Sequence, residues 1–159
     1  MILHDSYAGL FALLSCSGWL AMFAAKKSGH LWLGNCFGIL YHLALAPVVQ
    51  ALPAPEFVRV AGYVWILCDA LIDVASINGM GEREVWALRM GVHIPASLWI
   101  IGSSLQMPAL SLTVGVLLGG VLALHAIAGP ALPNAKMKLF IFVLPAMTVW
   151  LCLIAFNSL

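Results

Sequence analysis

The sequence predicts an all-α protein that crosses a membrane with six helices and forms a single transmembrane domain, residues 1–159. Hydrophobic residues make up 64% of the chain and charged residues only 8%, and the mean hydropathy is +1.06. So much apolar material exceeds what one soluble core of this length could bury. It falls into solid blocks, whereas the strands of a membrane barrel would alternate polar and apolar residues. The blocks therefore predict helices.

Each apolar run is close to the ~20 residues that a membrane-spanning helix needs. In chain order the runs cover residues 7–25, 31–53, 57–79, 86–104, 108–130 and 137–157. No Lys or Arg precedes the first run and no small-residue cleavage site follows it, so we expect a retained helix rather than a signal peptide. Glycines, prolines and polar residues that stop helices mark the turns between the runs. These turns occupy residues 26–30, 53–56, 78–82, 106–108 and 129–134.

The basic residues predict how the helices are oriented in the membrane. Lys and Arg are retained on the cytoplasmic side, and they orient a chain more strongly than its net charge does. Arg59 alone lies near an even-numbered turn, and the other six lie at odd-numbered turns: Lys26, Lys27, Arg83, Arg89, Lys136 and Lys138. The odd turns should therefore face the cytoplasm and both termini should lie outside it, in a membrane of the bacterial inner-membrane type.

A weak internal repeat is visible between the second and fifth runs. The segment from His42 to Pro47 resembles the segment from His125 to Pro130, and an Ala-Leu-Pro sequence follows each of them. A repeat unit of three helices would insert its two copies in opposite directions, as in inverted-repeat transporters. The sequence thus suggests a 3+3 inverted repeat.

Five ionisable residues lie inside the apolar runs, where polar groups are costly and usually functional. They are His42, Asp69, Asp73, His93 and His125. With a rise of ~1.5 Å per residue, all five fall in one slab that extends from the midplane into the cytoplasmic half. Four different helices contribute to the slab, so the sequence predicts a convergent binding or proton-relay site.

Asp69 and Asp73 are four residues apart and share one face of the third helix. Two ionised carboxylates in this arrangement repel each other unless a cation, a histidine or a proton lies between them. Arg89 lies at nearly the depth of Asp73, which predicts an ion pair between the third and fourth helices. In a purely structural interpretation, this pair and an Asp69–histidine contact only hold the helices together.

The leading functional hypothesis is a proton- or cation-linked transporter or channel. Histidine and aspartate together can exchange protons near neutral pH. Asp69 and Asp73 would hold the ion, and His42 and His93 would switch partners during translocation.

Two other classes stay open, so the sequence does not decide whether the protein is an enzyme. An intramembrane zinc-dependent lipid hydrolase would use His42, His93, His125 and Asp69 as metal ligands, with the second aspartate or Ser97 orienting water. A non-catalytic subunit of a membrane complex could ligate haem through His42 and His93.

Several partner classes can be judged from composition and motifs. The net charge of +1 argues against nucleic acid, and an ATP-binding GxxxxGK[ST] motif is absent. The expected partners are the lipid bilayer and either a membrane protein or a second copy of the chain. Four dispersed cysteines form no CxxC pair and should serve as packing residues: Cys16, Cys36, Cys68 and Cys152.

The predicted orientation can be tested by labelling in whole cells. A reporter fused after Leu159 should be active outside the cytoplasm, and a cysteine introduced at Lys27 should be protected from impermeant reagents added outside. The opposite pattern of activity and labelling would invert the predicted orientation.

Overall fold

A computed structural model describes residues 6–128 and 133–158, with side chains for residues 7–128 and 141–158. All regular structure in these residues is helical, so the predicted all-α class is confirmed. Each of the six helices is long and apolar enough to cross a membrane. The helices are α1 (Ser6–Lys27), α2 (Leu31–Ala51), α3 (Glu56–Ile77), α4 (Glu82–Ser104), α5 (Ala109–Ala128) and α6 (Pro133–Ser158).

The first and third helices end in the same way. Gly29 and Gly79 follow them with φ angles of +82° and +93°, a left-handed conformation that glycine adopts at little cost. The next residue then donates a backbone hydrogen bond back into the helix, from His30 to Ala25 at 2.9 Å and from Met80 to Ala75 at 3.0 Å. These glycine turns stop α1 and α3 close to where the sequence predicts.

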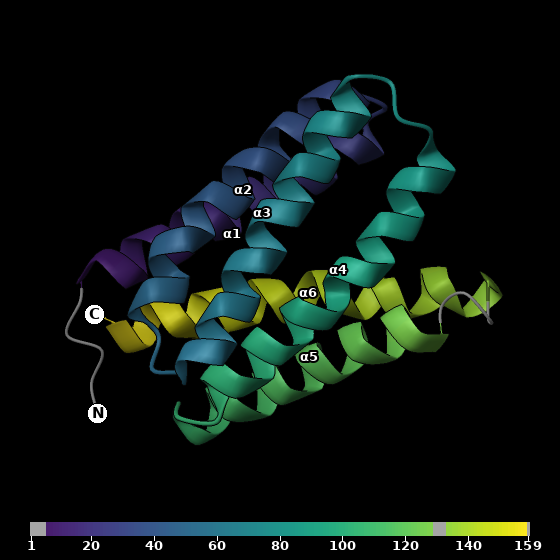
Figure 1. Ribbon diagram of the computed structural model, residues 1–159. Coiled ribbons are helices and arrows are strands. Elements are labelled where there is room, and N and C mark those ends of the chain that lie inside the picture. The colour runs from purple at the N-terminus through teal and green to yellow at the C-terminus, as the bar shows by residue number, and fades with distance from the viewer. Residues whose placement is uncertain (1–5, 129–132, 159) are drawn as a thin grey trace.

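The helices pack in chain order and close into a ring. Each helix lies against the next one, and α6 returns to lie against α1. Figure 1 shows α1, α2 and α3 as one group, α5 and α6 as another, and α4 leading from the first group to the second. Large apolar side chains such as Leu67, Leu117 and Phe156 are exposed on the outside, as suits a surface covered by lipid.

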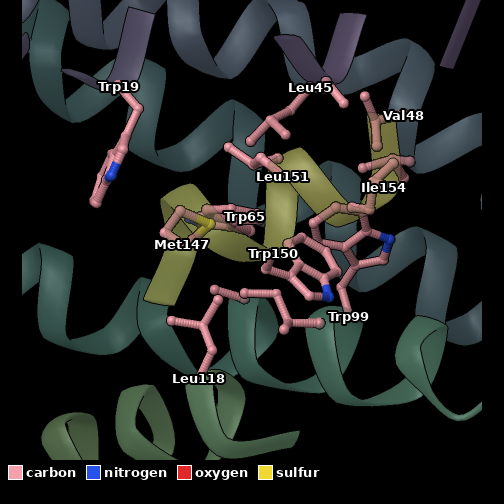
Figure 2. Packing of buried hydrophobic residues seen from close by; sticks show 14 of the residues in the cluster. Trp19, Leu45, Val48, Trp65, Trp99, Leu118, Met147, Trp150, Leu151 and Ile154 are labelled. Atoms are coloured by element: carbon pink, nitrogen blue, oxygen red, sulfur yellow. The ribbon is translucent and has the colours of Figure 1, made fainter. Parts of the chain in front are cut away.

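Three tryptophans fill the centre of the ring. Trp65 of α3 lies 5.5 Å from Trp99 of α4, which lies 5.3 Å from Trp150 of α6, measured between ring centroids (Figure 2). All three are buried. The indole N–H of Trp150 donates to the hydroxyl of Ser104 at 3.0 Å, which satisfies a polar group that would be costly in an apolar interior.

The suggested inverted repeat remains a prediction. A closed ring of six helices is compatible with two units of three. His42, however, lies near the middle of α2, whereas His125 lies in the last turn of α5. Pro130 lies outside the described residues, so the end of the second copy of the motif is not described. The cellular membrane and the sides of the termini also remain predictions.

Close packing of α5 depends on Gly115. A Cβ atom at this position would lie 2.7 Å from Cβ of Ser104 and 2.8 Å from the indole nitrogen of Trp150. Neither atom is the far end of a flexible chain. On the same helix, Gly120 has nothing within 4 Å of the corresponding point. Gly115 thus allows α5 to approach its neighbours closely, as small residues do between membrane helices.

We expect Gly115→Ala to destabilise the protein and Gly120→Ala to stabilise it slightly. Both changes gain about 1 kcal/mol of helix propensity, but only Gly115→Ala overpacks the interior, at a cost of about 1–3 kcal/mol. Unfolding in mixed detergent micelles measures the difference. Equal stabilities of the two variants would show that α5 is not packed as described.

Candidate functional site

A buried charge cluster joins the first four helices. It consists of Lys26 from α1, His42 from α2, Asp69 and Asp73 from α3, and Arg89 from α4. Asp73 is fully buried and Asp69 is 5% exposed. One helical turn separates the two aspartates, so both carboxylates point into the same interior space.

Asp73 binds both cations of the cluster. Its Oδ1 accepts a hydrogen bond from Nη2 of Arg89 and lies 3.7 Å from Nζ of Lys26. Its Oδ2 approaches the backbone of α2 at Gly38, where any Cβ atom would collide with the carboxylate. Gly38 is therefore the residue that lets this carboxylate lie between α2, α4 and the end of α1.

Asp69 has a different set of partners. Its Oδ2 accepts a hydrogen bond from the indole N–H of Trp65 at 3.2 Å and lies 3.2 Å from Nε2 of His42. Its Oδ1 lies 3.9 Å from Nε of Arg89, too far for a hydrogen bond. The closest contacts of Asp69 are therefore with an indole and an imidazole rather than with a permanent cation.

His42 lies between two acceptors. Its Nδ1 is 2.7 Å from the carbonyl oxygen of Gly38, and its Nε2 faces Asp69. The carbonyl oxygen and the carboxylate oxygen both only accept hydrogen bonds. A neutral imidazole carries a proton on one ring nitrogen only, so in either tautomer the bare nitrogen places a lone pair against one of these oxygens. The geometry is satisfied when the His42–Asp69 pair holds one further proton, either on Nε2 or on the carboxyl group.

The other two candidate histidines contact each other. His93 of α4 and His125 of α5 stack with their ring centroids 5.5 Å apart, and Trp86 meets His125 edge-on at 5.5 Å. His93 also borders the cavity that reaches Asp69. The structure thus brings His42, Asp69, Asp73 and Arg89 together, places His93 beside them, and turns His125 toward His93 and Trp86.

A cavity of about 270 Å³ opens beside the cluster. Its lining includes residues of all six helices and is mostly apolar and aromatic, with Lys26, Asp69, Glu82 and Arg89 as charged members. It extends from Trp65 in α3 to Leu31 and Glu82 at the exposed starts of α2 and α4. The cavity therefore connects the buried cluster with the end of the bundle that the sequence places in the cytoplasm.

Sequence reasoning assigned no site role to two members of this arrangement. Lys26 counted only as a charge that orients α1, and its position in the last turn of that helix is the signal that it could reach Asp73. Tyr41 precedes His42, and the tilted contact between their rings, 4.5 Å between centroids, places both at the cavity. Trp65, one helical turn before Asp69, also lines the cavity.

The zinc and haem interpretations do not fit this geometry. No three or more His, Cys, Asp or Glu side chains in the described part of the chain are arranged to hold a metal ion. Haem ligation needs a histidine nitrogen directed at the iron. Both ring nitrogens of His42 already face protein oxygens, so this residue offers no axial ligand.

No family model, curated protein or solved structure matches the chain. Its function is therefore argued from the geometry of the cluster and the cavity.

Removing one partner of the Asp73–Arg89 pair should be far more harmful than removing both. Asp73→Val or Arg89→Met alone leaves a charge in a low dielectric and should cost about 3–5 kcal/mol of unfolding free energy. The double variant should cost much less than the sum, because no member of the pair remains uncompensated and Lys26, with a side chain 28% exposed, can reach the interface.

The measurement is a double-mutant cycle on unfolding in detergent micelles. Arg59→Met is the control, since Arg59 lies in the first turns of α3 and donates to the carbonyl oxygen of Ala54 rather than to a carboxylate. Strict additivity of the two single variants would show that the ion pair contributes no coupling energy.

Proposed function

We propose that this membrane protein is a proton-linked transporter in which the His42–Asp69 pair binds and releases the proton. The observation that carries the proposal is the position of His42 between two acceptor oxygens, at 2.7 Å and 3.2 Å. A pair that is satisfied only when it holds an extra proton is a proton-binding element. Its location deep in the apolar part of the chain matches that of relay groups in pumps and transporters.

The groups around the pair make its proton sensitive to the rest of the cluster. Lys26 approaches from α1, Asp73 lies one turn further along α3, and Arg89 and His93 approach from α4. Any ligand charge in the cavity adds to this set. The cavity therefore supports a mechanism in which substrate and proton influence each other's binding.

The packing favours a carrier over an open channel. The cavity reaches the end of the bundle where α2 and α4 begin, while Trp65, Trp99 and Trp150 fill the interior beyond it. A site that is accessible from one side is one state of an alternating-access cycle. A partner membrane protein or a second copy of the chain remains part of the proposal, as does a bacterial-type inner membrane with both termini outside the cytoplasm.

Asp69→Asn should abolish proton movement and leave folding intact. Asparagine keeps the shape of the side chain but cannot share a proton with His42. In vesicles that contain purified protein and a trapped pH-sensitive dye, an imposed potassium diffusion potential or a pH gradient should drive protein-dependent proton flux. The flux is measured with sodium, potassium or tetramethylammonium chloride outside, because a coupled carrier needs a counter-substrate.

Ser111→Ala is the matched control for this experiment. Ser111 is buried and accepts a hydrogen bond from Asn157 at 2.8 Å, so its loss perturbs a buried polar contact away from the cavity. We expect this variant to retain the flux. The proposal is wrong if wild-type vesicles match protein-free vesicles under every salt condition, or if Asp69→Asn retains full flux.

A further inference from the structure

The cavity beside Asp69 has an aromatic wall contributed by α1, α2 and α3, and Trp86 of α4 also lines it. Trp19 of α1 lies 5.2 Å from Tyr41 of α2, and Tyr41 lies 6.4 Å from Trp65 of α3, between ring centroids. Phe23 packs edge-on against Trp19 at 4.6 Å. All four rings line the cavity. The faces of such rings carry negative potential and attract cations, and clusters of them recognise quaternary ammonium groups.

Two residues that line the cavity each carry a buried polar atom with unused hydrogen-bonding capacity. Oδ1 of Asp69 accepts no hydrogen bond from the described residues, because Trp65 and His42 both contact Oδ2. The hydroxyl of Tyr41, on a side chain that is 1% exposed, likewise has no hydrogen-bond partner among the described residues. Buried polar groups are normally satisfied, so an unpartnered carboxylate oxygen and an unpartnered hydroxyl on two cavity-lining residues favour a ligand with a positive charge or a donor group.

The two protein cations make their closest contacts with Asp73 rather than with Asp69. Arg89 donates to Asp73, and the Lys26 ammonium also lies closest to Asp73. The nearest guanidinium nitrogen is 3.9 Å from Oδ1 of Asp69. Asp69 and the aromatic residues therefore line the same cavity, while Lys26 and Arg89 make their closest contacts with the neighbouring carboxylate of Asp73.

Charge counting links this ligand to the proton. Lys26 and Arg89 carry two positive charges and the two ionised aspartates carry two negative charges, so the cluster is neutral before the His42–Asp69 pair takes its extra proton. With that proton, the buried cluster holds one excess positive charge. A cationic ligand at Asp69 would add a second, which a low-dielectric interior strongly disfavours. Proton and cation should therefore exclude each other.

We propose that the cavity binds a small organic ammonium ion between Trp19, Tyr41 and Trp65, with its positive charge at Asp69, in exchange for the proton of the His42–Asp69 pair. Binding transfers that proton to bulk water, and no covalent bond changes. The volume of about 270 Å³ lies just below the range of pockets for drug-sized ligands, which limits the ligand to a small ion. Ammonium binding stands on the cavity alone, whereas the exchange rests on the proposed transport function.

Binding can be measured by calorimetry on purified protein in detergent. The probes are choline chloride and its neutral isostere 3,3-dimethylbutan-1-ol, with sodium chloride as the ionic-strength control. Choline should bind saturably, and the neutral alcohol at least about tenfold more weakly, as expected for a desolvated cation–aromatic contact. In buffers of different ionisation enthalpy, about one proton should be released per choline at a pH where the pair is protonated. Lowering the pH further should weaken binding, because the proton competes.

Variants separate the aromatic and acidic contributions. Trp19→Leu should weaken choline binding about tenfold, Tyr41→Phe should weaken it more modestly by removing only the hydroxyl, and Asp69→Asn should abolish it. Trp32→Leu is the control, because Trp32 is 63% exposed and does not line the cavity. Tyr41→Phe keeps the aromatic ring, so it tests the site even where a larger substitution impairs folding. Gel filtration of each variant shows whether it is folded.

Several outcomes would overturn the inference. Absence of saturable choline binding, equal affinity for the neutral alcohol, or unchanged affinity in both Trp19→Leu and Tyr41→Phe would each show that the cavity is not an ammonium site. Choline binding without any vesicle proton flux would leave the site standing and refute the transport function. Proton flux with sodium but no choline binding would support the transport function and refute the ammonium site.

Discussion

The burial of the Asp73 carboxylate is the constraint on which the rest of the site depends. An ionised carboxylate without water must be surrounded by donors and cations, and Asp73 is fully buried. Arg89 supplies a hydrogen bond from α4, Lys26 supplies a second charge from the end of α1, and Gly38 allows α2 to come close. One side chain thus fixes how the first four helices approach one another.

The same arrangement gives the two aspartates different chemistry. Asp73 takes the strongest cationic contacts, so Asp69, one turn away, is left with an indole, an imidazole and a distant guanidinium. A carboxylate whose closest partner is a histidine can exchange a proton with it, whereas a carboxylate bound to arginine stays ionised. The sequence suggests a structural pairing for Asp73 and a functional role for Asp69. The two are complementary, because the pairing of Asp73 with the cations leaves Asp69 with a histidine as its closest ionisable partner.

The sequence predicts the helices well because their signals are local. Length, apolar content and glycine or proline stops define where each helix begins and ends, and Gly29 and Gly79 act at the expected turns. The proximity of Asp73 and Arg89 also follows from depth alone. The rotation of a helix about its axis cannot be predicted from depth. Because α5 is apolar on all sides, nothing local indicates that His125 turns toward His93 and Trp86 rather than toward the carboxylates. The cavity could not be predicted either, since it depends on how side chains of all six helices fail to fill one region.

The proposed exchange at a buried site requires that access change sides, and the positions of two prolines bear on how this would occur. Pro47 follows His42 in α2, and Pro95 follows His93 in α4. Both helices begin at the end of the bundle that the cavity reaches, so each proline lies beyond the charged part of its helix. A proline inside a helix removes a backbone hydrogen bond and lets the helix bend at lower cost than elsewhere. Bending at this level would move the segments that carry His42 and His93 relative to the tryptophan core. In α2 the proline thus follows His42 of the proposed proton-binding pair, and in α4 the core residue Trp99 follows the proline.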